Sequence, residues 1–590
     1  MLMIKSMATI ARFRSTAVVV LVTLVASMTA PAFAQDNPQR QRDPTLPEIA
    51  PREIEIRGQF QVGFPSLQRQ PLRGFASPPT VPVIPPDRLP YTETYKQERS
   101  DLPEQLPSPP SVGSRLATSP PPANGYVEAG AGRYLSRFAE GHVTLPVTPM
   151  ESFEIDAAYD GSAGFEPSTT SDGSTQHDDV EGSLRFVSER EAVSIDAGLR
   201  GLTSTYDQYA AVPNSSGTIG ASSPDRTVQS GGLFARIRTH GRIPTSFGLS
   251  FDQTSASANT EVGTDNRDYE QQRFAINARG AIPFGTREIE ADIAASTSGL
   301  GSSAFEGDVQ TLNLGGSAIA YRSGPTVIRA GARLLTFQSG SSSDSPPTPE
   351  ASATYFVPTG ELTIAMTPRF TIFAVNQPGL EHNTLLSRMS DTPWLAPQRY
   401  VRPTLYATRA DAGVRVSVGP LRITSHAGYR YAPSYRFVEP GPVVGYENGF
   451  FRSNYESARI AEAGASLALQ GFDQVQAILR ATIRDGQLTD SDTSIPYFSP
   501  LVVESALTYS FLDGKALAGM ELGVESPRYV DRSETEQTDT IVDLDLNGSY
   551  HVTPIIDIVA RLDNMGASFE RYAGYERPPT TVTAGIRIHW

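Results

Sequence analysis

The stretch TVTAGIRIHW, residues 581–590, shows the pattern that decides the fold. Apolar side chains occupy every second position, while small or polar side chains occupy the positions between them. The apolar positions are Val582, Ala584, Ile586, Ile588 and Trp590. In an extended chain, successive side chains point to opposite faces, so a period of two places all five on one side. The pattern predicts a β-strand with one apolar and one polar face.

The same alternation recurs along residues 541–552, 421–431 and 473–485. Counting from Tyr126, the sequence predicts about 22 such strands, separated by connections that alternate between short and long. One of the predicted short turns is Pro358–Gly360. Short turns at one rim and long loops at the other are typical of an outer-membrane barrel, whose apolar face meets lipid. We therefore expect an all-β, transmembrane, antiparallel outer-membrane β-barrel over residues 125–590.

Composition excludes several other classes of protein. Beyond the N-terminus, the 590 residues contain no run of the ~20 apolar residues that a spanning helix needs. The chain has no cysteine, which excludes a disulfide scaffold and a cysteine-ligated metal centre. Its formal net charge of −15 lacks the basic footprint of a general nucleic-acid binder, so we expect no nucleic-acid partner.

The N-terminus predicts the cellular compartment. Lys5, Arg12 and Arg14 precede a short apolar run at 17–25, and Ala32-Phe33-Ala34 follows. A charged segment, an apolar segment and an Ala-x-Ala site are typical of a secretory signal peptide, which we assign to residues 1–34. Together with the barrel, this signal predicts a protein of the outer membrane of a Gram-negative bacterium, in contact with its lipid.

Residues 35–124 differ from the rest of the chain, because they contain 19 prolines. Proline fixes φ and lacks an amide donor, so we expect an extended, largely disordered periplasmic leader. One segment alternates, and it could add a strand to the sheet of a periplasmic partner. A chance alternation in a disordered leader remains the alternative. The residues of this candidate docking strand are Glu53, Ile54, Glu55, Ile56, Phe60 and Val62.

The C-terminal 50 residues resemble the last strands of TonB-dependent outer-membrane receptors. The resemblance rests on RLDN at 561–564, FERY at 569–572 and GYERPP at 574–579. The stretch YVEAGAGRYL at 126–135 is similar to the first barrel strand of bacteroidete-type members. The resemblance implies a 22-strand barrel and a role in transport. The terminal Trp590 resembles the signal by which such barrels engage the barrel-assembly machinery.

The chain also departs from that family. Its members carry a folded plug domain of well over a hundred residues before the barrel. Here residues 35–124 supply only 90, rich in proline. We therefore expect no recognisable plug domain, and the plug residues of the family are not transferred to this chain.

The sequence contains no Gly-x-Ser-x-Gly elbow, phosphate-binding loop or His-Glu-x-x-His pair. We accordingly expect no enzyme, no cofactor and no metal site. His426, His551 and His589 share the polar parity of their strands and are interpreted as hydrated lumen residues. The aspartates of 543–563 are expected to form an acid–arginine ladder with Arg561 and Arg587.

Two loops are unusually rich in apolar or aromatic residues. The loop 374–409 contains Leu385-Leu386 and Pro393-Trp394-Leu395, so we expect it to fold back onto the lumen or the barrel mouth. The 431–455 region mixes aromatic residues with arginines, which suits a glycan, a siderophore-like anion or lipopolysaccharide. An aromatic girdle at the lipid interface is the alternative. The candidate extracellular ligand loop comprises Arg430, Tyr431, Tyr435, Arg436, Phe437, Phe450, Phe451 and Arg452.

A barrel of 22 strands is too wide for the side chains of its wall to fill. Infolded loops, the leader or a separate protein must therefore occupy the lumen. We expect a role in transport or uptake across the outer membrane. The alternative is a scaffold that does not transport, whose leader recruits a periplasmic partner.

Overall fold

The computed structural model describes residues 125–590, except for 168–174, 210–224, 242, 260–268, 285–286, 303–304, 342–350, 397–400, 442–448, 470–471, 473, 566–569 and 573. The predicted signal peptide, the leader and the candidate docking strand lie outside the described residues. Across the part that is described, no helix is long and apolar enough to cross a membrane.

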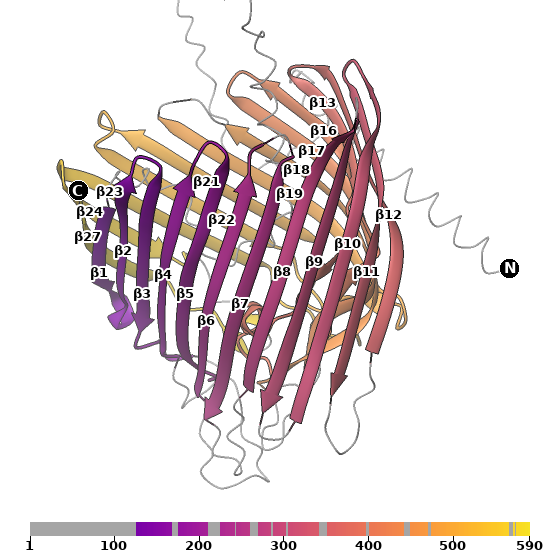
Figure 1. Cartoon of the computed structure of the whole chain (residues 1–590). Helices are drawn as coiled ribbons and strands as arrows, with labels where there is room; N and C mark the ends of the chain where they lie inside the picture. The colour runs from indigo at the N-terminus through magenta and orange to yellow at the C-terminus, as the bar shows by residue number, and fades with distance from the viewer. Residues whose placement is uncertain are drawn as a thin grey trace, which may run out of the picture. The chain divides into compact units, whose positions relative to one another are not determined.

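Twenty-two long strands form one closed antiparallel sheet, which confirms the predicted barrel (Figure 1). The first eleven are β1 (Gly125–Gly132), β2 (Arg137–Thr148), β3 (Glu151–Ser162), β4 (His177–Glu189), β5 (Val193–Asp207), β6 (Asp225–Thr239), β7 (Thr245–Asn259), β8 (Tyr269–Phe284), β9 (Arg287–Ser302), β10 (Phe305–Ser323) and β11 (Thr326–Ser341). The others are β12 (Ala351–Thr367), β13 (Phe370–Asn376), β16 (Thr408–Val418), β17 (Leu421–Pro440), β18 (Phe451–Leu469), β19 (Val475–Leu488), β21 (Leu501–Phe511), β22 (Ala516–Glu525), β23 (Ile541–Thr553), β24 (Ile556–Asp563) and β27 (Thr581–His589).

Shorter elements lie in the connections between these strands. They are η2 (Arg133–Leu135), β14 (Gly379–Glu381), α2 (Leu385–Asp391), β15 (Thr404–Tyr406), β20 (Thr493–Ser494), β25 (Glu570–Tyr572) and β26 (Tyr575–Glu576).

The barrel closes where β1 pairs with β27, so the two ends of the described chain lie side by side (Figure 1). Glu128 of β1 is fully buried and accepts hydrogen bonds from Arg561 at 2.6 Å and from Arg587 at 2.7 Å. The predicted arginines thus bind Glu128 across the closing seam, while Asp557 contacts His551 instead of an arginine. An ionic contact therefore reinforces the one place where the two ends of the sheet must meet.

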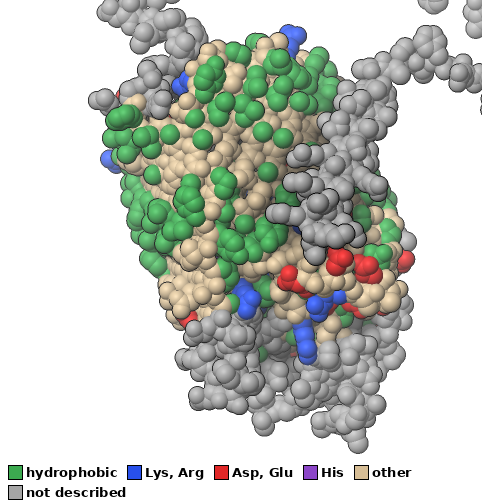
Figure 2. Space-filling model, turned by 90° about the vertical axis from the view of Figure 1, so that its right-hand side faces the viewer, with side chains coloured by type: hydrophobic (Ala, Val, Ile, Leu, Met, Phe, Trp, Pro, Cys, Tyr) green, Lys and Arg blue, Asp and Glu red, His purple; other side chains and the backbone are tan. Residues whose placement is uncertain are grey.

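The outer surface is apolar. Ile586 and Ile588 of β27 are 55% and 48% exposed, whereas the intervening Arg587 has a side chain that is only 12% exposed. Figure 2 shows hydrophobic side chains spread over the visible face of the barrel, with charged side chains gathered toward its lower end. Such an apolar band with polar margins is what a lipid bilayer requires of a barrel wall.

One predicted turn was wrong. Pro358 and Gly360 lie inside β12, and the chain reverses at residues 368–369 instead. Proline normally interrupts a sheet because it cannot donate to a ladder. Here β12 begins to pair with β13 only at Gly360, so no β13 strand lies beside Pro358. The strand therefore continues through a residue that usually ends one.

Candidate functional site

The described part of the connection between β13 and β16, residues 377–396 and 401–407, folds into the barrel, as its apolar sequence predicted. Leu385 and Met389 of α2 and the following Leu395 are buried. They share a cluster with Tyr269 of β8 and Leu300 of β9, strands that are not neighbours of β13 or β16 in the sheet. We call residues 377–396 and 401–407 the infolded segment.

A local signal starts the single helix of the infolded segment. Thr384 lies at the N-cap of α2, and its side-chain oxygen accepts a hydrogen bond from the backbone amide of Ser387 at 3.1 Å. Threonine favours this position because it satisfies an amide that has no partner within the helix. The turn directs Leu385 and Met389 toward the wall.

Arg226 of β6 is the main polar anchor of the infolded segment. Its side chain is 1% exposed and donates to the backbone carbonyls of Pro393 at 2.8 Å and Leu395 at 2.7 Å. The Tyr206 hydroxyl of β5 also donates to the Pro393 carbonyl, at 2.7 Å. Hydrogen bonds from a charged donor are about twice as strong as neutral ones, so this contact holds the segment firmly.

Two further polar contacts attach the segment to the wall. Gln271 of β8 accepts a hydrogen bond from the backbone amide of Leu385. His382 lies 3.5 Å from the hydroxyl of Ser296 in β9. Burial, reinforced by the positive charge of Arg273, lowers the pKa of His382 to about 4. His382 is therefore neutral at pH 7 in the folded segment.

A second loop, between β24 and β27, meets the infolded segment inside the barrel. Tyr575 is 1% exposed, and its ring stacks on Trp394 with centroids 3.7 Å apart. Its hydroxyl donates to the carbonyl of Gly449, and Tyr572 donates to the carbonyl of Asp391 at 2.8 Å. Tyr572 also contacts Tyr497 of the β20–β21 connection, so aromatic side chains from three connections form one cluster within the lumen.

A cavity of about 980 Å³ lies between this cluster and the inner faces of β2–β5. Acidic residues project from the strand side, among them Asp160 and Asp179. Arg571 and Arg577, with Trp394, line the loop side. The volume falls at the upper end of the range for small-molecule sites, and aromatic walls with a few charged groups are typical of them. We take the cavity and the infolded segment together as the candidate functional site.

The structure separates the residues of the candidate extracellular ligand loop. Tyr431 is exposed on the barrel surface, Phe437 is buried with Leu488, and Phe451 is buried in the aromatic cluster. Arg430 pairs with Glu462 on the inner wall, and Arg436 pairs with Asp391 of α2 at 3.0 Å. Of the remaining members, Tyr435 lies on β17 and Arg452 on β18, and Phe450 directly precedes β18. Binding of a ligand by this loop stays a prediction.

Several residues of the site carry no sequence signal. Arg226 and Gln271 look like ordinary inward-facing residues of their strands, because their partners are more than a hundred positions away. His426 has the expected inward parity, but the sequence does not reveal that it lies beside Asp411 and Glu462. Trp590 is half exposed, and its backbone amide donates to the Gly125 carbonyl at 3.1 Å.

No protein-family model matches the sequence, and no curated protein matches it either. Solved structures do share its fold. The copper transporter OprC aligns with a TM-score of 0.59 at 12% identity, over 79% of this chain and 80% of its own. The ferric yersiniabactin uptake receptor FyuA from Yersinia pestis aligns with a TM-score of 0.59 at 13% identity, over 80% of this chain and 81% of its own.

The ferripyoverdine receptor of the outer membrane of Pseudomonas aeruginosa, bound to ferripyoverdine, also aligns with a TM-score of 0.59. It is 12% identical and is matched over 72% of its length and 80% of this chain. Identities this low establish a shared fold. The resemblance to the barrel of TonB-dependent outer-membrane receptors is thus confirmed at the level of the fold.

Proposed function

We propose that this chain takes up a solute across the outer membrane, with the infolded segment forming part of a gate. The observation that carries the proposal is the attachment of this segment to the wall. α2 and the extended chain around it are attached to the wall by side chains such as Arg226 and by short backbone pairings with β17 and β18. A lumen of 22 strands must be closed at rest, and a closure that lies outside the ladder of the wall can be released without unfolding the wall.

The chemistry of the cavity supports a chelate or another polar, ring-containing solute as cargo. Arginines and Trp394 face carboxylates across about 980 Å³, which is enough for a ligand with both charged and planar groups. The proteins of similar fold are described as a copper transporter and as receptors for ferric complexes. We therefore place metal chelates first among the solutes to be tested.

The absence of cysteine makes a direct test of the gate possible. Ser296→Cys combined with His382→Cys introduces the only two thiols, at positions whose side chains are 3.5 Å apart in the folded segment. A short bis(methanethiosulfonate) reagent, which forms a disulfide with each thiol and releases sulfinate, should then fix the segment to the wall, and a reductant cleaves the link. Accumulation of radiolabelled iron and copper, supplied as chelates, is measured in cells that express the full chain.

We expect crosslinking to abolish accumulation and cleavage of the crosslinker to restore it. Each single-cysteine variant treated with the same reagent is the matched control. Accumulation no higher than in cells lacking the protein would refute metal chelates as cargo. Accumulation that is unaffected by the crosslink would instead refute the infolded segment as the gate.

We further propose that the alternating segment 53–62 docks a periplasmic protein. The supporting feature is its parity, since Ile54, Ile56, Phe60 and Val62 share one face of an extended chain. Chemical crosslinking in intact cells should join the full-length protein to its periplasmic partner. Replacing Ile54 and Ile56 with aspartate should abolish this crosslinked adduct. An adduct that survives both substitutions would contradict this docking.

A further inference from the structure

On the inner wall, some residues that pair directly across three adjacent strands have a glycine in the middle position. We call each such set of three residues a row. Arg200, Gly232 and Asp252 lie opposite one another on β5, β6 and β7. A Cβ at Gly232 would lie 2.5 Å from a carboxylate oxygen of Asp252, so only glycine lets Arg200 reach across to it, at 2.6 Å. The same arrangement recurs on β9, β10 and β11 with Asp292, Gly315 and Arg333.

A third row breaks this rule. Asp411, Gly428 and Glu462 lie opposite one another on β16, β17 and β18, so a second carboxylate replaces the arginine. A Cβ at Gly428 would lie 2.5 Å from Asp411 Oδ1 and 2.9 Å from Glu462 Cγ. The glycine therefore brings two like charges together, an arrangement that costs energy unless a cation lies between them.

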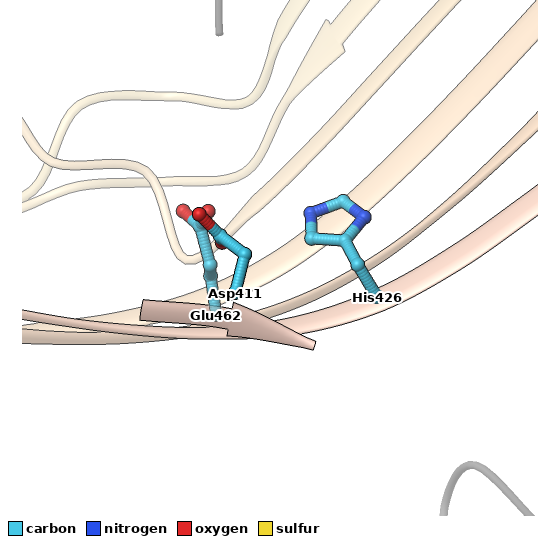
Figure 3. A group of neighbouring side chains, drawn as sticks. All are labelled: Asp411, His426 and Glu462. Carbon is cyan, nitrogen blue, oxygen red and sulfur yellow. The ribbon is translucent and has the colours of Figure 1, made fainter. Parts of the chain in front are cut away.

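His426 lies next to the two carboxylates. It precedes Gly428 by two positions on β17, so it projects from the same face of the sheet. Figure 3 shows the three side chains pointing to one side of the wall. One potential ligand atom from each of Asp411, His426 and Glu462 lies within 4.8 Å of the others.

The surrounding contacts leave one oxygen of Asp411 without a hydrogen bond. Arg430 donates to Glu462 Oε1 at 2.6 Å, and the Glu462 side chain is 8% exposed. Asp411 Oδ1 is also buried, yet no described residue hydrogen-bonds to it. A buried carboxylate oxygen without a partner is strongly disfavoured. Arg430 thus binds and orients Glu462, while among the described residues no hydrogen bond reaches Asp411 Oδ1.

We propose that Asp411, His426 and Glu462 bind a divalent metal ion of the first transition row on the inner wall. One imidazole nitrogen and two carboxylate oxygens form a mixed ligand set that suits zinc and its neighbours in the row. The ion would supply the positive charge that arginine supplies in the other two rows. Arg430 would act as the outer partner of Glu462, as such partners commonly orient metal ligands. Because binding does not require an open gate, this inference is independent of the proposed function.

The test uses the untagged full-length protein, purified in detergent, stripped with a chelator and dialysed against Zn²⁺. Mass spectrometry of the metal then gives the zinc content per chain. We expect one tightly bound ion in the unmodified protein and at least a tenfold weaker Kd in Asp411→Asn and in His426→Ala. The ligand replacement Asp411→Asn keeps the shape of the side chain, so it separates lost ligation from lost folding.

Matched variants sharpen the result. Gly428→Ala keeps all three ligands but adds a methyl group between the acids, so it should also abolish binding. Gly299→Ala, where an added Cβ meets nothing within 4 Å, should bind normally. The His142→Ala variant should also bind zinc normally. His142 lies 2.7 Å from Asp156, so this variant removes a histidine–carboxylate pair that is not part of the proposed site. Absence of tight zinc binding in the unmodified protein, or binding that persists in Asp411→Asn and His426→Ala, would overturn the proposal.

Discussion

The barrel wall and the infolded segment bury their apolar residues in opposite directions. On β7, Leu249 faces outward while Ser250 faces the lumen, so the wall is apolar outside and polar inside. The infolded segment instead hides Leu385 and Leu395 inside the barrel. Every wall strand has a paired neighbour on each side, whereas the segment is attached by short pairings and by side chains such as Arg226. The difference predicts that the infolded segment unfolds locally before the wall does.

Deletion of residues 379–404 should produce the largest effect. Replacing them with a short Gly-Ser linker removes most of the infolded segment from the lumen, while the wall pairs as before. We expect large single-channel conductance in planar bilayers and influx of antibiotics that are normally excluded. Deletion of residues 35–124 is the comparison. If that variant conducts strongly and the loop deletion does not, the leader is the principal closure.

Leu249→Arg and Ser250→Arg test the wall with two adjacent residues. An arginine facing lipid destabilises a membrane barrel by about 2–4 kcal/mol near the midplane, whereas one facing water costs little. We expect the free energy of unfolding in lipid vesicles to fall by that amount for Leu249→Arg. For Ser250→Arg, the change should stay within about 0.5 kcal/mol. Equal losses would mean that the outer face does not meet lipid.

Arg226→Met should loosen the infolded segment and leave the wall unchanged. The substitution removes two hydrogen bonds from a charged donor, each of which contributes about 1.5–3 kcal/mol. Hydrogen exchange should therefore accelerate in residues 385–396 alone. The control is Arg238→Met on the same strand, since Arg238 is exposed. Faster exchange throughout β6 and β7 would show that the segment and wall unfold together.

Acidification should release the segment through His382. Its folded pKa of about 4 is below the usual value of 6.5, so the neutral form stabilises the attached state. That contribution is complete above pH 6.5 and is lost as the pH falls toward 4, on the order of 2 kcal/mol after allowance for partial exposure. Pepsin digestion within residues 385–396, carried out at each acidic pH, reports the release.

His382→Asn should flatten this pH dependence, because asparagine does not titrate. His240→Asn is the matched control, since His240 lies outside the infolded segment. A cleavage rate that rises equally at low pH in both variants would assign the pH effect to other groups.

The number of strands, and which of their side chains point outward or inward, could be predicted because both follow from the alternation of apolar and polar residues along the chain. The side-chain period of two repeats over every strand and needs no knowledge of its neighbours. The turn at Pro358 could not be placed correctly, because the outcome depended on how far β13 extends beside β12. The inward fold of residues 377–396 and 401–407 was visible from composition, but its anchor Arg226 was not.

The sequence by itself therefore determined the barrel, its apolar exterior and the inward path of one loop. Each follows from the side chains of neighbouring residues in the chain. Only the tertiary structure decided which residues meet across the sheet and the lumen. Asp411, Gly428 and Glu462 share one row because of the register between three strands, and Arg226 reaches Leu395 because the barrel closes around the loop. Such contacts depend on strand register and closure, which alternation along a single strand does not encode.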